Sequence, residues 1–281
     1  MIVCGHSEVK RTESGWEVRI DELVGQALNL FPGQVLFGAS DEGSKRIFLS
    51  PLKLNPHVSY FRVFLEDIRG SLASMTDLFS ERGINILSGG AFGFGNIWVS
   101  EFIADFKGID PTPETIINEI EGLGGFVTSR EITELFPRAF ELRSTYEIKT
   151  GDPDGMYLLL SSLPEGMIEE PPIYAVLKAW PRVQALFIDF YSSESKLLKI
   201  SAKIRDVPGS LNKLAGLLKT QVNLIAIGEQ HHDEVSGEWT IYGVLEMGGL
   251  DELRDKATEI SNILRIDVEP LSWETDDSVI R

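Results

Sequence analysis

Residues 67–72 read Asp-Ile-Arg-Gly-Ser-Leu, and residues 206–211 read Asp-Val-Pro-Gly-Ser-Leu, 139 positions later. Each copy is followed by apolar residues at the i, i+3, i+7 spacing of a helix, and then by an apolar-Asn-apolar strand start at 84–86 or 222–224. The stripe positions are Leu72, Met75 and Phe79 in the first copy and Leu211, Leu214 and Leu218 in the second. The repeat indicates that the chain consists of two related halves.

Periodicity supplies the elements around each copy. A strand is predicted before the first copy over 60–65, and before the second over 198–204, where apolar and polar residues alternate. A second helix is predicted downstream, with Pro113 at its start in the first half and apolar residues from Leu253 to Leu264 in the second. Each unit therefore predicts β-α-β-β-α-β, a ferredoxin-like arrangement of the α+β class with helices on one face of an antiparallel sheet.

The segments ahead of these units are rich in predicted strands. The strand segments are 17–20, 35–37 and 46–49 in the first half and 157–160, 175–177 and 185–188 in the second. Since their order corresponds at an offset close to 140, we expect the duplication to cover both parts of each half. The predicted domains are a small β-rich module at 1–53, an α+β module at 57–136, a second β-rich module repeating the first at 138–196, and a second α+β module at 197–273.

Composition excludes several classes of protein. The 281 residues carry a net charge of −17, which disfavours general binding to a phosphate backbone, and no apolar run is long enough to cross a membrane. The single cysteine, Cys4, excludes an internal disulfide and a cysteine-based zinc site. We expect a cytoplasmic protein with no membrane partner and no cofactor.

The repeated motif has the chemistry of a ligand site. A helix start offers unpaired N–H groups that attract a carboxylate, glycine allows close approach, and the strand asparagine can donate and accept. The same residues also suit a purely structural role, in which the aspartates form turns that start the helices and the glycines serve the backbone. The candidate ligand-binding residues are Asp206, Gly209, Ser210, Leu211 and Asn223 in the second copy and Asp67, Gly70, Ser71 and Asn85 in the first.

The order strand, Asp-x-Pro-Gly-Ser-Leu, helix, apolar-Asn-apolar strand resembles the ACT domain, a regulatory module of amino-acid-pathway proteins. The second copy matches throughout, whereas the first carries Arg69 where proline is usual, which makes it the degenerate partner. The resemblance implies that ACT units pair side by side, with an amino acid or similar effector at their interface. It also implies that the loop before the first helix and the strand asparagine contact the effector.

Residues 1–53 resemble the swapped-hairpin modules of AbrB-type regulators. The resemblance rests on residues 16–20, a short predicted helix over 23–30, Pro-Gly-Gln-Val-Leu at 32–36 and a strand over 46–49. Such modules dimerise and often bind DNA. Because 1–53 holds six basic and seven acidic residues with no basic cluster, we expect protein pairing and keep DNA binding as an alternative.

A metal site and a catalytic site are both disfavoured. Alternation on a strand would place Glu229, His231 and Asp233 on one side, but this cluster lies at a predicted turn where exposed polar residues are usual. No pairing of the four histidines with a nucleophile is visible. We therefore predict neither metal nor catalytic residues and expect a non-enzymatic protein.

The motif chemistry together with the ACT resemblance implies a regulator that senses a small metabolite, an amino acid, at an interface between ACT units. We expect it to form a homodimer and to act on a protein target. One alternative is a ligand-responsive DNA-binding regulator that uses 1–53. The others are a structural or protein-interaction module and an uncharacterised enzyme.

Overall fold

The computed structural model describes residues 2–40, 45–55, 57–108, 112–132, 144–151, 155–164 and 172–272. For residues 128–132 it describes the backbone only. The predicted boundaries at 136, 138 and 273 lie outside these ranges. The chain divides into two compact units, one of Met1–Pro51 with Ser144–Arg281 and the other of Leu52–Arg143. The elements are helical and antiparallel β, so the α+β class is observed.

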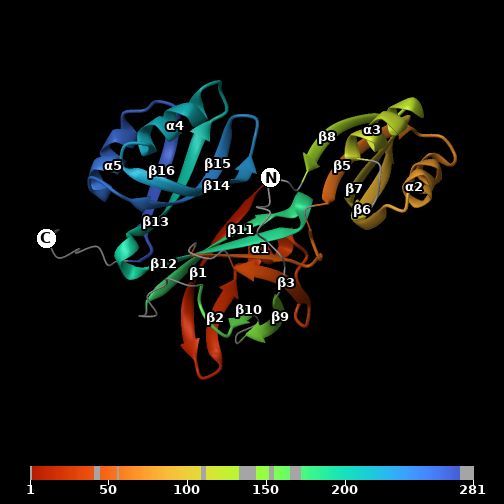
Figure 1. The fold of residues 1–281 in the computed structure, drawn as a ribbon. Helices are drawn as coiled ribbons and strands as arrows, with labels where there is room; N and C mark the ends of the chain where they lie inside the picture. The colour runs from red at the N-terminus through yellow and green to blue at the C-terminus, as the bar shows by residue number, and fades with distance from the viewer. Residues whose placement is uncertain are drawn as a thin grey trace, which may run out of the picture. The chain divides into compact units, whose positions relative to one another are not determined.

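Sixteen strands and five α-helices follow one another along the described part of the chain (Figure 1). The strands are β1 (Val3–Thr12), β2 (Gly15–Ile20), β3 (Val35–Ser40), β4 (Arg46–Ser50), β5 (Val58–Glu66), β6 (Asn85–Phe94), β7 (Ile97–Asp105), β8 (Phe126–Ile132), β9 (Ser144–Gly151), β10 (Gly155–Leu160), β11 (Ile173–Trp180), β12 (Ala185–Ser192), β13 (Leu197–Arg205), β14 (Val222–His232), β15 (Ser236–Leu245) and β16 (Ile263–Pro270). The helices are α1 (Glu22–Ala27), α2 (Ser71–Glu81), α3 (Pro113–Gly122), α4 (Ser210–Leu218) and α5 (Leu250–Thr258), with short 3₁₀ turns at Pro181–Val183 and Ser193–Ser195.

The two β-rich segments form one closed barrel, so the prediction of two separate small modules is wrong. The barrel order is β1-β11-β12-β4-β3-β9-β10-β2, with every pairing antiparallel. Each segment contributes two hairpins that do not pair with each other, and hairpins of the two segments alternate around the barrel. The reason is physical, since an isolated hairpin cannot cover its apolar face, and closure removes every unpaired edge.

The barrel has an internal two-fold pattern of pairing. Each strand of the later segment begins 138 to 141 residues after its counterpart, as β12 does at Ala185 after β4 at Arg46. Exchanging β1 with β9, β2 with β10, β3 with β11 and β4 with β12 leaves the set of neighbouring strands unchanged. The pairing of β1 with β11 thus has its equivalent in that of β9 with β3. The later segment occupies the place that a second copy of the first would take.

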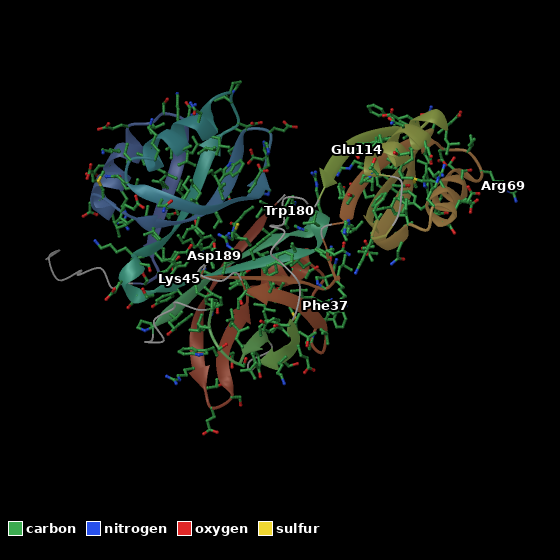
Figure 2. All side chains as sticks on the ribbon, in the orientation of Figure 1. Phe37, Lys45, Arg69, Glu114, Trp180 and Asp189 are labelled. Atoms are coloured by element: carbon green, nitrogen blue, oxygen red, sulfur yellow. The ribbon has the colours of Figure 1, made fainter. Side chains whose placement is uncertain are left out.

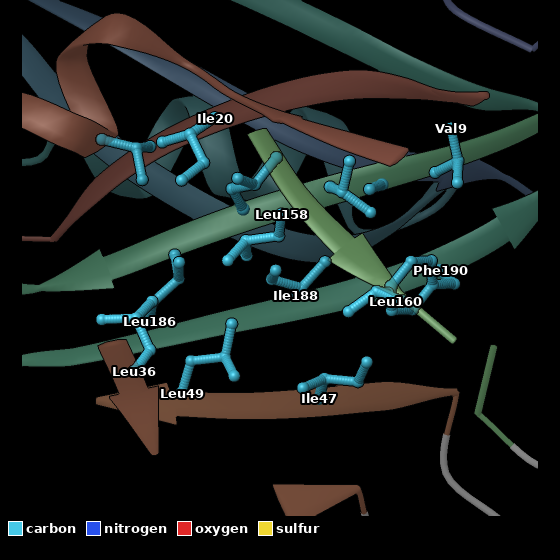
Figure 3. Packing of buried hydrophobic residues seen from close by; sticks show 14 of the residues in the cluster. Val9, Ile20, Leu36, Ile47, Leu49, Leu158, Leu160, Leu186, Ile188 and Phe190 are labelled. Atoms are coloured by element: carbon cyan, nitrogen blue, oxygen red, sulfur yellow. The ribbon is translucent and has the colours of Figure 1, made fainter. Parts of the chain in front are cut away.

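Aliphatic side chains from both segments fill the barrel. Figure 3 shows Leu36, Ile47 and Leu49 from the first segment with Leu158 and Ile188 from the second. The inward positions alternate along the strands, as the period of a half-buried strand requires. Leu158 and Ile188 are fully buried, so neither segment has a core of its own here.

A buried carboxylate ties three barrel strands together on the outer surface. Asp189 of β12, labelled in Figure 2, is 5 % exposed. Its side chain accepts hydrogen bonds from the Arg46 guanidinium of β4 and from the Lys178 ammonium of β11. The second Arg46 contact, from Nη2 to Oδ2, measures 3.3 Å. Because β4 belongs to the first segment and β11 and β12 to the second, this cluster joins the two halves of the chain.

The two α+β modules have the same element order and the same sheet order. The second module runs β13, α4, β14, β15, α5, β16 and its sheet is ordered β14-β15-β13-β16. The first runs β5, α2, β6, β7, α3, β8 with the sheet β6-β7-β5-β8. In the second module α4 and α5 lie on one face of the sheet (Figure 1). Ile200, Leu214 and Leu253 belong to the core of this module. None of the helices in the described ranges is long and apolar enough to cross a membrane.

Candidate functional site

The second copy of the motif forms the loop between β13 and α4. Gly209 is the N-cap residue of α4, with φ at 86°, and no side chain caps this helix start. A Cβ at Gly209 would meet nothing within 4 Å, so the left-handed backbone alone requires glycine. Ser210 is buried, and its hydroxyl accepts a hydrogen bond from Asn262 Nδ2 at 3.0 Å. The loop therefore presents an uncapped helix N-terminus.

A histidine between two carboxylates borders this loop. His232 Nε2 lies 3.1 Å from Asp206 Oδ2, and its Nδ1 lies 3.1 Å from Glu229 Oε1. The hydrogen bond to Asp206, followed by the charges of the nearby carboxylates, raises the pKa of His232. With the imidazole protonated, two carboxylates and one cation leave a net negative charge. The cluster therefore favours a cationic group such as an ammonium.

A pocket of about 240 Å³ unites these features. Its lining includes Asp206, Gly209, Leu211, Glu229, His232 and Trp239. Leu211 is 40 % exposed although its spacing predicts a buried helical position, because it lies in the first turn of α4 and faces the pocket rather than the core. The pocket thus combines carboxylates, an uncapped helix start and apolar walls.

The first copy shares the backbone geometry of this site but not its charged cluster. Gly70 is the N-cap residue of α2, with φ at 100° and no side-chain cap. It lines a pocket of about 200 Å³ together with Arg69, which is labelled in Figure 2. Ser71 Oγ donates to the Glu66 carbonyl at 2.6 Å. Gly93 takes the position in the first module that His232 takes in the second. Gly93 of β6 pairs with Trp98 of β7, and His232 of β14 pairs with Gly237 of β15. The first copy therefore has no imidazole beside Asp67.

The two strand asparagines lie at the opposite end of their sheets from the aspartates, so each predicted set of ligand residues is divided. Asn223 pairs with Val244, which pairs in turn with Leu197 at the start of β13, whereas Asp206 follows the end of β13. The eight residue steps along β13 place the two ends about 26 Å apart. Asn85 and Asp67 are divided in the same way, because Asn85 pairs with Asp105 at the far end of β7. Sequence spacing did not reveal this because the helix returns the chain to the start of the sheet.

The alternation that would bring Glu229, His231 and Asp233 together is interrupted. A bulge between Glu229 and His231 shifts the register of β14 and brings His232, rather than His231, to Glu229. Asp233 lies beyond the strand, where its Oδ1 accepts from the N–H groups of Val235 at 2.8 Å and Ser236 at 2.6 Å. These backbone donors lower the pKa of Asp233. Among the described residues no group of three or more histidine, cysteine or acidic side chains is arranged to hold a metal ion.

Sequence reasoning missed His232 and Trp239 as parts of the site. Both lie in the strand pair β14–β15, and only the bulge decides which of the two adjacent histidines meets Asp206. A bulge has no reliable signature in a single sequence when glycine does not mark it. Trp239 lies in β15 and Trp98 in β7, the third strand of each α+β module, but the place of Trp239 in the pocket depends on the pairing of β15.

No protein-family model matches the chain, and no curated protein matches it. Among solved structures, an unknown protein from Galdieria sulphuraria is similar at 9 % identity and a TM-score of 0.28, over 76 % of this chain and 98 % of that one. Protein BT0572 from Bacteroides thetaiotaomicron is similar at 13 % identity and a TM-score of 0.21, over 77 % and 94 % of the two chains. A candidate glycine cleavage system transcriptional repressor is similar at 10 % identity and a TM-score of 0.26, over 76 % and 98 %. These TM-scores are too low to assign the chain a fold or a function.

Proposed function

We propose that the protein is a non-enzymatic cytoplasmic regulator that senses a small metabolite, an amino acid, through ACT-like modules. The observation that carries the proposal is the uncapped N-terminus of α4, which opens into a pocket that also holds Asp206, Glu229 and His232. An amino acid has two charged ends, and this pocket offers a partner for each. The helix start suits the carboxylate, and the acidic cluster suits the ammonium.

The ACT-like interpretation is supported by the order of the elements. Both modules run β-α-β-β-α-β, and in each sheet the first and third strands lie at the centre and the second and fourth at the edges. The ACT resemblance implies a ferredoxin-like arrangement, and this order of elements supports it. The repeated Asp-x-x-Gly-Ser-Leu lies in each module at the start of the first helix.

The division of the candidate residues supports a site that two modules complete. Asn223 lies about 26 Å from Asp206 along its own sheet, a distance that a single amino acid cannot span. Asn223 can therefore contact the same ligand only when another module supplies it. We propose that this second module comes from a second copy of the chain, as a homodimer, and that the ligand favours the paired arrangement by its differential affinity.

The test is a thermal-shift screen of the twenty amino acids, followed by calorimetric titration of any that raise the midpoint. A ligand at a hundred times its Kd stabilises the folded protein by about 2.7 kcal/mol, which such a screen detects. Asp206→Asn should weaken binding at least about tenfold, whereas Asp251→Asn should not, because Asp251 is an exposed aspartate on α5 of the same module. If no amino acid stabilises the wild type, or if both variants bind alike, the proposal fails.

A further inference from the structure

The sheet of the first α+β module has an apolar row on the face that points away from its helices. The row runs in register across all four strands, and its members are Phe92 of β6, Val99 of β7, Phe64 of β5 and Phe126 of β8. Val63 packs in the core with residues of α2 and α3, and side chains alternate along a strand, so the neighbouring Phe64 points to the opposite face. Phe92 and Phe126 are exposed, so the row places aromatic side chains in solvent.

The second module carries a charged and polar row at the same place in its sheet. Its members, in the same order of strands, are His231, Glu238, Lys203 and Arg265. Lys203 Nζ lies 3.3 Å from Glu238 Oε1, and the Arg265 side chain is largely exposed. The two modules share their element order and their sheet order. The fold itself therefore does not require an apolar row here.

The other end of this face in the second module shows what becomes of its apolar residues. Leu197 and Tyr242 lie there and are buried in one cluster with Cys4 and Val176 of the barrel. In the second module the apolar part of the face is thus covered, and the charged part is open to solvent. By the same rule, we expect the apolar row of the first module to be a contact surface.

We propose that the partner of this row is the same row of a second copy of the chain, so that two first modules pack sheet against sheet around a two-fold axis. The row carries no charge, and two copies of a chain with a net charge of −17 repel each other least where each of them is uncharged. This contact goes beyond the proposed function, because the amino-acid site uses the second module alone.

The surface of β6 suits a two-fold contact. Gly90 lies two residues before Phe92 on the same face of the strand, and a Cβ there would meet nothing within 4 Å. Phe92 therefore stands beside a space that Gly90 leaves open. In a two-fold contact a residue of one copy meets a second residue of the other copy, and the reverse contact is formed as well. Phe92 of each copy can therefore fill the space over Gly90 of the other.

The exposed apolar area is that of a small dimer interface. Phe92, Phe94 and Phe126 are 58 %, 73 % and 62 % exposed, and at about 200 Å² for a whole aromatic side chain they leave roughly 400 Å² in solvent. Homodimer interfaces are about 65 % apolar, so the contact would cover roughly 600 Å² on each copy. The total of about 1,200 Å² lies at the lower end of specific interfaces. We therefore expect a dimer that dissociates at micromolar concentration.

The experiment is sedimentation velocity of the full chain without added amino acid, from about 1 to about 100 μM, a range over which the wild type should pass from monomer to dimer. Phe92→Glu should weaken the association at least about a hundredfold, as the loss of a central aromatic residue does. Gly90→Val fills the open space and should weaken it about tenfold. Phe31→Glu, the same change at a phenylalanine that is 57 % exposed outside this module, should dimerise like the wild type.

Both surface variants should fold, which makes their association comparable with that of the wild type. Phe92 is exposed and a Cβ at Gly90 is unhindered, so each variant should keep the wild-type far-UV circular dichroism spectrum. The proposal is overturned if the wild type stays monomeric, if Phe92→Glu or Gly90→Val dimerises as the wild type does, or if Phe31→Glu weakens the association equally. Association that appears only with an added amino acid would overturn it as well, since that is the contact of the second modules. A failed amino-acid screen leaves the sedimentation result unaffected.

Discussion

Removal of the Asp189 carboxylate should destabilise the barrel where β4 of the first half of the chain meets β11 and β12 of the second. Asp189→Leu leaves Lys178, whose side chain is only 15 % exposed, without its buried partner. Breaking a buried pair by removing one member costs about 3–5 kcal/mol. The Arg46 contact adds little to this figure, because that side chain is 46 % exposed and exposed pairs contribute about 1 kcal/mol or less.

The magnitude can be tested with a matched pair of variants. Adding Lys178→Met to Asp189→Leu removes both buried charges, and replacing a buried ion pair by apolar side chains is often neutral. The double variant should therefore regain most of the stability that Asp189→Leu loses. Arg46→Met alone should cost no more than about 1 kcal/mol.

The assay is urea unfolding followed by hydrogen exchange and mass spectrometry of peptides from β4, β11 and β12. Peptide resolution is needed because a chain of several folded parts does not unfold as a single two-state unit. The reasoning is refuted if Asp189→Leu loses less than about 0.5 kcal/mol, or if the double variant is less stable than the single one.

Three further predictions concern single positions. Gly209→Ala should destabilise the second module by about 1–2 kcal/mol, because φ at this position is 86°. Gly216→Ala should stabilise the module, because Gly216 lies inside α4 and a Cβ there meets nothing within 4 Å. The melting temperature should therefore fall for the first variant and rise for the second. Leu158→Ala, at a fully buried barrel position, should cost about 2–5 kcal/mol by urea unfolding of the barrel. An equal loss on Val35→Ala, at a barrel position that is 47 % exposed, would contradict that account. Burial lowers the pKa of His6, and the charge of Lys199 lowers it further, whereas Glu269 and Asp21 act in the opposite direction. As the pH falls, the histidine of the unfolded chain is therefore protonated before that of the folded protein. The folded protein loses stability below about pH 6.5. The melting temperature should fall more between pH 7.5 and 5.5 for the wild type than for His6→Asn, and parallel curves would argue against a buried neutral His6.

The strands that the sequence predicted are those with apolar residues facing a core. Residues 17–20, 46–49, 157–160 and 185–188 all lie in barrel strands, because strands buried on one face or both carry an apolar pattern. The strands β1 and β9 were missed. Their sequences, VCGHSEVKRT and STYEIKTG, are mostly polar, and pairing with other strands rather than apolar content places them in the barrel.

The predictions of the site residues failed where they depended on pairing between strands far apart in the sequence. The helix stripes placed Met75 and Phe79 correctly in a core, since local spacing determines a helix face. The bulge in β14 and the ends at which Asn223 and Asp206 lie depend on register with β13 and β15. Such register is not readable from one sequence. The barrel itself depends on pairing between segments far apart in the chain, for which two similar strand patterns give no partner assignment.

Closure of the barrel also fixes the order of events during synthesis. Val3 of β1 pairs with Ala179 of β11, so the first strand has no partner on that edge until 176 further residues have been made. At elongation rates of about 5–20 residues per second, this edge stays open for roughly 9–35 s. In the sequence, the unit Leu52–Arg143 comes between the two barrel segments, and it has its own core. It can therefore fold on the ribosome before the barrel strands have all been made. Because open strand edges pair with other chains, the nascent chain is prone to association until β11 has been made.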